Sequence, residues 1–174
     1  MLSLVNDSRS ELAEFFCTYP TGEFSISELA EETGFSKPWI SEKVDELEET
    51  GFLTVEKRRN LKIARFNREN QESINTKRII NLEQLYSSGL VSKLEEKYMH
   101  PETIVLFGSF SRGEDTEKSD IDIAVISFET ADIETEVMER PVSIHEFEPG
   151  SVPENMKETL ANGINLQGYL EIKG

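Results

Sequence analysis

The stretch from Ile104 to Ile126 constrains the fold more than any other part of the chain. Its two apolar runs, Ile104–Phe107 and Ile121–Ile126, each have the length of a buried strand. The polar segment between them begins with Gly108 and Ser109, so a glycine and a small hydroxyl residue directly follow the first run. The pattern predicts a strand, a tight corner, a short polar helical turn and a second strand.

Two aspartates stand at the start of the second predicted strand. Because side chains alternate along a strand, Asp120 and Asp122 share one face, and the isoleucines beside them lie on the other. Two carboxylates at this spacing suit Mg²⁺, which takes a few carboxylates together with substrate phosphates. The N–H groups of a corner such as Gly108-Ser109 can approach phosphate oxygens closely. The alternative, a plain turn followed by a solvated strand end, is less favoured because the opposite face is unbroken and apolar.

The residues of this stretch resemble a known family. Gly-Ser, ten intervening residues and then Asp-x-Asp is similar to the signature of minimal nucleotidyltransferases in the DNA polymerase β superfamily, and the resemblance covers about Leu90 to Ile126. It implies a small α/β domain with a mixed sheet that binds an NTP, with ATP expected, and Mg²⁺. Transfer of a nucleoside monophosphate to a hydroxyl acceptor is the implied activity.

The resemblance also implies roles for individual residues. Gly108 and Ser109 would hold the β- and γ-phosphates, and Asp120 and Asp122 would hold Mg²⁺ and serve as the catalytic acids. Arg112 and Ser119 are further candidates for nucleotide binding; alternatively, Arg112 is a surface residue paired with Glu114 or Asp115. In such relatives the acceptor can be a partner protein, as in antitoxin modules, a small molecule or an RNA end, and the sequence leaves this choice open.

One member of the expected catalytic set is missing. Relatives usually carry a third carboxylate on a neighbouring strand, predicted here for Pro141–Phe147, and by analogy it falls near Ser143. Glu146 is nearby, but alternation puts it on the opposite face, whereas His145 shares the face of Ser143. General-base help is typically worth about 10²–10⁴-fold in rate. The gap therefore predicts slow chemistry, a substitute base or binding without turnover.

Three short helices and a hairpin are predicted for the first seventy residues. The helices are Ser8–Thr18, Glu28–Thr33 with Ser27 as cap, and one from Ser36 to Gly51, followed by strands at Phe52–Glu56 and Ile63–Phe66. This order, with the phrases Ile26-Ser27-Glu28-Leu29-Ala30 and Gly51-Phe52-Leu53, resembles a winged helix-turn-helix domain. The whole chain is then α+β. The expected domains are a winged helix-turn-helix over 1–70, a connecting helix over 71–88 and a nucleotidyltransferase-like domain over 89–174, whose tail adds a helix near 153–160 and an extended or helical 164–172.

The predicted hairpin carries a run of basic residues that contains no acid. Its candidate nucleic-acid contacts are Lys57, Arg58, Arg59 and Lys62. Such a wing can grip a DNA or RNA backbone, or it can be a solvated hairpin whose charges balance acidic neighbours. The third helix, which would enter the major groove, is strongly acidic and opposes the first interpretation.

Composition narrows the remaining choices. The net charge of −16 opposes nucleic-acid binding over the whole surface, and Cys17, the single cysteine, excludes a disulfide framework. Met1–Val5 is too short for a secretory signal and no apolar run approaches membrane length, so a cytoplasmic protein without a membrane partner is expected. Besides the enzyme, two hypotheses stay open: a DNA-binding regulator with a degenerate nucleotide-sensing domain, and a winged helix that serves only for docking or homodimerisation.

Overall fold

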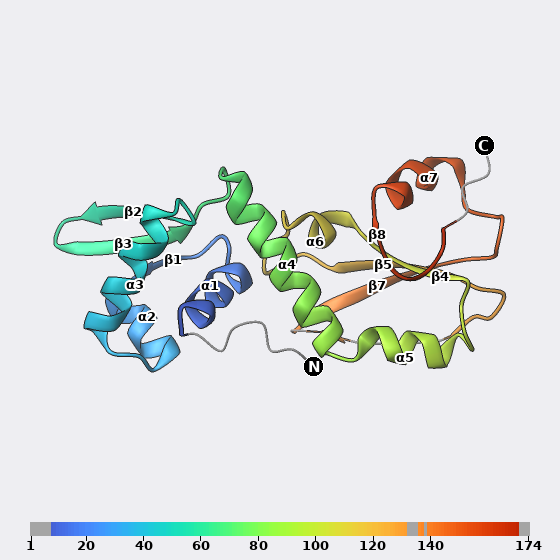
Figure 1. Ribbon diagram of the computed structural model, residues 1–174, viewed down its shortest axis with the longest axis horizontal. Helices are drawn as coiled ribbons and strands as arrows, with labels where there is room; N and C mark the ends of the chain where they lie inside the picture. Colours follow the sequence, from blue (N-terminus) through green and yellow to red (C-terminus); the bar gives the residue numbers. More distant parts are fainter. Residues whose placement is uncertain (1–7, 132–135, 138, 171–174) are drawn as a thin grey trace. The chain divides into compact units, whose positions relative to one another are not determined.

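A long helix, α4 (Gln71–Ser87), contains the boundary between two units of the chain, Met1–Lys77 (unit 1) and Arg78–Gly174 (unit 2) (Figure 1). The computed structural model describes residues 8–131, 136–137 and 139–170. The connector expected over 71–88 is this helix, and the boundary between the units falls inside it. None of the described helices is long and apolar enough to cross a membrane.

Unit 1 combines helices with a three-stranded antiparallel sheet of order β1-β3-β2. Its elements are α1 (Ser8–Thr18), β1 (Glu23–Ser25), α2 (Ile26–Thr33), α3 (Lys37–Glu49), β2 (Leu53–Arg58) and β3 (Leu61–Phe66). Strand β1 is too short to show an alternation pattern, and the sequence does not predict it. The core consists of apolar side chains from the helices and the sheet, among them Leu12, Phe16, Leu29, Ile40, Val44 and Leu53.

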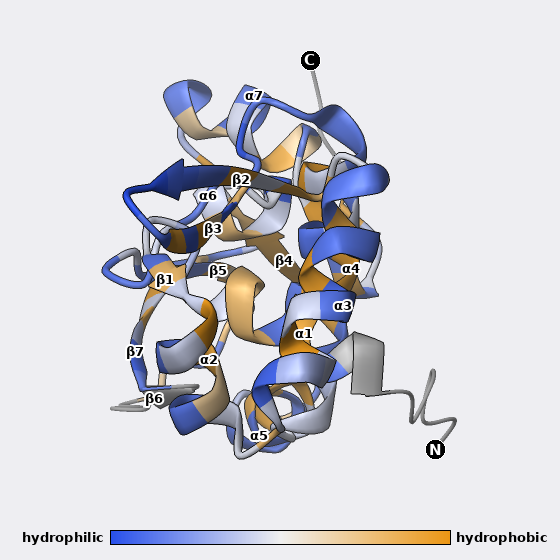
Figure 2. Cartoon of the chain, turned by 90° about the vertical axis from the view of Figure 1, so that its left-hand side faces the viewer, coloured by the Kyte–Doolittle hydropathy of each residue, from blue (hydrophilic) through white to orange (hydrophobic). Residues whose placement is uncertain are grey.

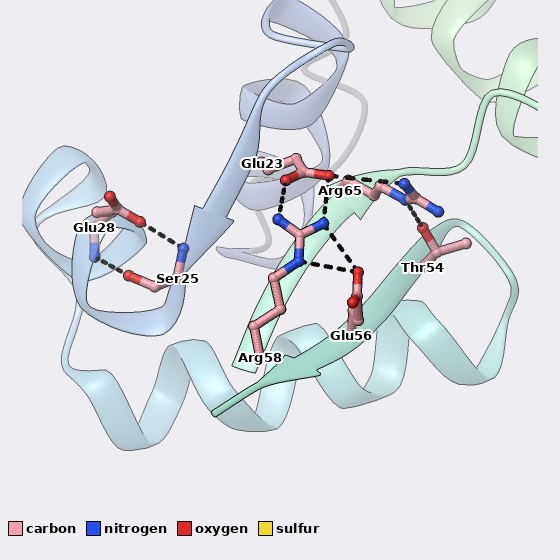
Figure 3. Close-up of polar contacts among 7 residues, drawn as sticks. All are labelled: Glu23, Ser25, Glu28, Thr54, Glu56, Arg58 and Arg65. Atoms are coloured by element: carbon pink, nitrogen blue, oxygen red, sulfur yellow. Dashed lines mark hydrogen bonds and ion pairs between the residues drawn. The ribbon is translucent and has the colours of Figure 1, made fainter. Parts of the chain in front are cut away.

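The start of α2 corrects one expectation from the sequence. The cap is Ser25 rather than Ser27: the Ser25 hydroxyl accepts from the Glu28 N–H at 3.3 Å, and the Glu28 carboxylate accepts from the Ser25 N–H at 2.7 Å (Figure 3). This reciprocal pair is a capping box. These hydrogen bonds lower the pKa of Glu28. The shift from Ser27 arises because β1 ends at Ser25 and leads directly into the helix.

Unit 2 is built on a five-stranded sheet of order β6-β7-β5-β4-β8. Strand β5 pairs with β7 in parallel, and the other pairs are antiparallel, so the sheet is mixed, as predicted. The elements of unit 2 after α4 are α5 (Leu90–Lys97), β4 (Thr103–Phe107), α6 (Gly108–Arg112), β5 (Ile121–Ile126), β6 (Glu136–Val137), β7 (Arg140–Phe147), α7 (Glu154–Ala161) and β8 (Ile164–Gly168).

The central strands of unit 2 are buried on both faces. All five residues of β4 are buried. One face packs against a cluster that includes Leu85 of α4 and Leu94 of α5, and the other packs against Leu160 of α7. Residues 128–140 lie partly outside the described residues, and their described part contains β6. With helices on both sides, polar side chains reach solvent at the start of β5, where Asp120 is exposed and Asp122 is half-buried.

Candidate functional site

The corner after β4 is built for a glycine. Gly108 has φ +75°, and a Cβ atom there would lie 2.2 Å from Oδ2 of Asp122. Any other residue would therefore be strained in its backbone and would also displace the carboxylate. The Asp122 side chain packs directly over the Gly108 Cα, because Phe107 at the end of β4 is the register partner of Asp122 on β5. The corner and the acid predicted from the sequence thus meet in space.

The two aspartates enter the same end of the sheet. Asp120 immediately precedes β5, and Asp122 is its second residue. The pKa of Asp122 is raised, chiefly by burial; His145 opposes that shift, Asp120 adds to it and Arg112 lowers it. A desolvated carboxylate beside a second carboxylate is a place where a cation from outside would be favoured.

Strand β7 brings two more side chains to these acids. The parallel register pairs Asp122 with Ser143 and Ala124 with His145. The Ser143 Oγ donates to Oδ2 of Asp120 at 3.0 Å, and His145 Nε2 lies 3.7 Å from Oδ1 of Asp122. The position at which a third carboxylate was expected is therefore beside the acids, and it holds a hydroxyl. The imidazole reaches the same group of side chains.

Further contacts of β7 fix the two faces. The His145 ring meets the Phe107 ring edge-on, with centroids 5.1 Å apart. Glu146 faces the other way, where its Oε1 accepts from the Tyr98 hydroxyl at 2.5 Å and from the Ala131 N–H at 3.0 Å. Burial and this carboxylate raise the pKa of Tyr98. Glu146 thus has a partner of its own away from the aspartates, as the predicted alternation requires.

Arg112 and Ser119 lie on either side of the loop between α6 and β5. The exposed Arg112 donates through Nε to Glu114 at 2.7 Å, which is the pairing considered as the alternative to a phosphate contact. The Ser119 hydroxyl accepts from the Thr116 N–H at 3.0 Å and so closes a turn of the loop just before Asp120. In this structure both residues contact their own loop.

The donor set near Gly108 fits a Mg²⁺ ion shared with a substrate. Across residues 8–131, 136–137 and 139–170, no three His, Cys, Asp or Glu side chains form a group that could hold a metal ion. Two neighbouring carboxylates, such as those of Asp120 and Asp122, are a donor set that suits Mg²⁺ when substrate phosphates complete the coordination. Close packing of Asp122 over a glycine leaves no room for a side chain between the acid and the corner.

The basic hairpin of unit 1 divides into paired and exposed residues. The guanidinium of Arg58 bridges Glu23 of β1, at 2.5 and 3.1 Å, and Glu56 of β2, at 2.9 and 3.1 Å (Figure 3). Lys62 pairs with Asp45 of α3. Lys57 and Arg59 are exposed, at the strongly hydrophilic end of the hairpin (Figure 2). Two of the four predicted nucleic-acid contacts thus already bind acids of unit 1.

Sequence reasoning missed one buried polar group next to the site. Asp115 was weighed only as a surface partner for Arg112, but it is buried and pairs with Arg140. Asp115 follows Glu114 in a polar loop, and nothing local separates the buried acid from the exposed one. The sequence did contain one signal of a buried ion pair: Arg140 is a charged residue at the start of a strand that is otherwise half apolar.

Comparison with known proteins gives a family match within unit 2. Residues 90–167 match the family described as "Polymerase beta, Nucleotidyltransferase". A 39-residue segment is 56% identical to the "Putative protein adenylyltransferase MJ0128" of Methanocaldococcus jannaschii; it covers 22% of this chain and 39% of that protein. No solved structure matches the chain significantly. The two matches support nucleotidyl transfer as the general activity of this region.

Proposed function

We propose that this protein binds an NTP with Mg²⁺ and transfers its nucleoside monophosphate to a hydroxyl acceptor. The observation that carries the proposal is the close packing of the Asp122 carboxylate over Gly108, with Asp120 beside it at the end of β4. This places two acids next to a strand-to-helix corner, where a triphosphate and its counter-ion are both accommodated. The family match over 90–167 supports the same activity.

Each side chain then has a definite task. Asp120 and Asp122 hold the metal, and the corner at Gly108 and Ser109 holds the β- and γ-phosphates. When bound, Mg²⁺ neutralises the charge that builds up on the phosphates during transfer. The acceptor oxygen attacks the α-phosphorus, the bond from that phosphorus to the bridging oxygen breaks, and pyrophosphate leaves.

The acceptor hydroxyl loses a proton in this reaction, and His145 is the side chain we assign to receive it. Ser143 stands where a third carboxylate was expected, and its hydroxyl is a poor base at neutral pH. The His145 Nε2 lies 3.7 Å from Oδ1 of Asp122, and the imidazole is partly exposed. It fills the role of the substitute base that the missing acid demands.

ATP is the expected nucleotide, and a protein hydroxyl is the acceptor class that we favour. The support for both is the name of the matched relative, a putative protein adenylyltransferase. The chain spans only 39% of that relative. Under this proposal, the acceptor is the hydroxyl group of a Ser, Thr or Tyr in a partner protein.

The direct test uses ATP labelled in its α-phosphate, Mg²⁺ and a cell extract as the source of acceptors. We expect label to enter a protein band with wild type, and none to enter with Asp122→Asn. Label that enters from the α-phosphate but not from the γ-phosphate identifies nucleotidyl rather than phosphoryl transfer. Equal labelling by wild type and Asp122→Asn would refute the assignment.

Unit 1 supports a second candidate function, that of a regulator or docking module. The support is its three helices, α1, α2 and α3, followed by the hairpin of β2 and β3, which is the order expected for a winged helix-turn-helix. We infer that unit 1 is such a domain. Since Arg58 and Lys62 already bind acids, contact with DNA or RNA would fall to Lys57 and Arg59. Protein docking or homodimerisation leaves all these ion pairs intact.

Fluorescence anisotropy with a labelled duplex at low salt separates these roles. A regulator binds the duplex, and Lys57→Ala with Arg59→Ala weakens that binding. Light scattering on the full chain reports a homodimer. Absence of binding even at low salt would dismiss the regulator.

A further inference from the structure

A buried polar cluster joins three elements behind the candidate site. Asn81 of α4 donates through Nδ2 to Oδ1 of Asp115 at 2.8 Å, and Arg140 of β7 donates through Nη1 to Oδ2 of the same carboxylate at 2.5 Å. Exposure is only 2% for Asn81, 1% for Asp115 and 5% for Arg140. Both carboxylate oxygens of Asp115 therefore have donors in a place without access to water.

Stability alone is a weak reason for such a cluster. Removing two charges from water is costly, so replacing a buried ion pair by apolar side chains is often neutral or stabilising. We therefore ask which elements the cluster holds in a fixed arrangement.

The elements it joins are those that carry the site. The Asn81 amide also donates to the carbonyl of Phe110, one residue after Ser109, at 3.0 Å. The Arg140 guanidinium lies over the Phe110 ring, 5.6 Å from its centroid. The corner helix α6 is thus fixed both through its backbone and through its one large buried side chain.

The cluster also reaches the acids and β7 along the chain. Asp115 lies in the loop that leads from α6 to Asp120, and Ser119 closes the next turn of that loop. Arg140 begins the strand whose next residues include Ser143 and His145. Asp115 and Arg140 are therefore each only a few residues along the chain from a side chain of the site.

We propose that Asp115 is a positioning residue for nucleotidyl transfer: with Asn81 and Arg140 it holds the corner, the aspartate loop and the start of β7 in one arrangement. The proposal rests on the proposed function for its catalytic consequence. Its structural consequence, an ordered loop from Gly108 to Asp120, does not depend on that function.

Hydrogen exchange tests the structural consequence. The reporters are the Glu114 N–H, bonded to the Ser109 carbonyl at 3.0 Å, and the Ser119 N–H, bonded to the Thr116 carbonyl at 3.1 Å. We expect Asn81→Leu to accelerate their exchange about tenfold, because a buried hydrogen bond to a charged group is lost. The matched control is Asn75→Leu, the same substitution at an exposed position of α4. Equal exchange in the two variants overturns the proposal.

Steady-state kinetics tests the catalytic consequence. We expect Asn81→Leu to reduce kcat about tenfold and to change KM for ATP by less than about threefold, because metal and phosphates still bind while the reacting groups are misaligned. Unchanged kcat together with accelerated exchange would overturn the positioning role. If wild type itself transfers nothing, the proposed function fails, and the exchange comparison still decides whether the cluster orders the corner.

Replacing the ion pair as a whole separates positioning from stabilisation. In Asp115→Leu with Arg140→Met the two partners of this ion pair are replaced together, so neither is left without the other, and we expect a Tm at or above that of wild type. Exchange at Glu114 and Ser119 should nevertheless rise as in Asn81→Leu, and kcat should fall. A variant that keeps wild-type Tm, exchange and kcat would show that the pair positions nothing.

Discussion

Charged side chains are arranged differently on the sheet of unit 1 and at the end of the sheet in unit 2. On the sheet of unit 1, Arg58 lies between Glu23 and Glu56, so these three charges are paired within the unit (Figure 3). At the end of the sheet in unit 2, Asp120 and Asp122 stand side by side, and burial raises the pKa of Asp122. Exposed pairs of the first kind contribute little to stability. A pair of like charges is costly unless something from outside neutralises it, which is why we look for function in unit 2.

The comparison is most strongly tested by removing the charge of Asp122. Because its pKa is raised by burial, its ionised form costs stability, and this cost grows as pH rises through that pKa. Asp122→Asn keeps the shape over Gly108 and removes the charge. We expect transfer to fall by more than about 100-fold, because mutating a residue that merely hydrogen-bonds to a metal ligand already costs about 10–100-fold in activity. Thermal unfolding at neutral pH should show an unchanged or higher Tm. A lower Tm with retained transfer would contradict the claim that the charge of Asp122 costs stability and serves function.

The next largest effect is expected at His145. Loss of a general base costs about 10²–10⁴-fold in rate, so His145→Ala should lower kcat by such a factor. KM for ATP should stay nearly constant, because the imidazole is assigned to the acceptor proton rather than to the phosphates. His145→Gln serves as the control that keeps a polar side chain without a base. Wild-type kcat in both variants would remove His145 from the mechanism.

A smaller effect, measured in stability, is expected at the corner. Gly108→Ala forces a non-glycine residue to positive φ and a Cβ to within 2.2 Å of Asp122 Oδ2. Gly150→Ala is the matched control, because Gly150 has φ +79° with nothing within 4 Å of a Cβ. The control should lose only the backbone strain, about 1–3 kcal/mol. In urea unfolding Gly108→Ala should lose more than the control, and equal losses would mean that Asp122 does not lie over the corner.

The smallest effect is expected in unit 1. The hydrogen bond from Arg58 lowers the pKa of Glu23. A depressed acid contributes stability above its unfolded pKa, and this is lost as pH falls through the folded pKa. In Arg58→Ala the pKa of Glu23, followed by NMR, should rise towards its usual value, with little change in Tm. A Glu23 pKa that does not move would show that the pair of Figure 3 does not persist in solution.

Local patterns were informative wherever neighbours in sequence decide the outcome. The apolar runs around Gly108 predicted β4 and β5, and alternation correctly separated His145 from Glu146. The cap of α2 was misplaced by two residues, because β1 is only three residues long and leaves no periodic signal. The hairpin strands were predicted too short, since the charged residues Lys57 and Arg58 belong to β2.

Ion pairs between residues far apart in the sequence could not be predicted from local patterns. Glu23 and Arg58 are 35 residues apart, and Asp115 and Arg140 are 25 apart. Nothing near Arg58 marks it as already bound to an acid, and nothing near Asp115 marks it as buried. The sheet order β1-β3-β2 brings Glu23 within reach of Arg58, a pairing that the sequence of the hairpin does not reveal.

The sequence by itself determined the corner, because only glycine suits its backbone, and the shared face of Asp120 and Asp122, because a strand repeats every two residues. Tertiary structure decided what surrounds those acids. The parallel register of β5 and β7 placed a serine and a histidine beside them. The fold also buried Asp115 and Arg140 together as an ion pair. The physical reason is one of range: backbone conformation and alternation act over a few residues, whereas desolvation and ion pairing depend on which distant segments the folded sheet brings together.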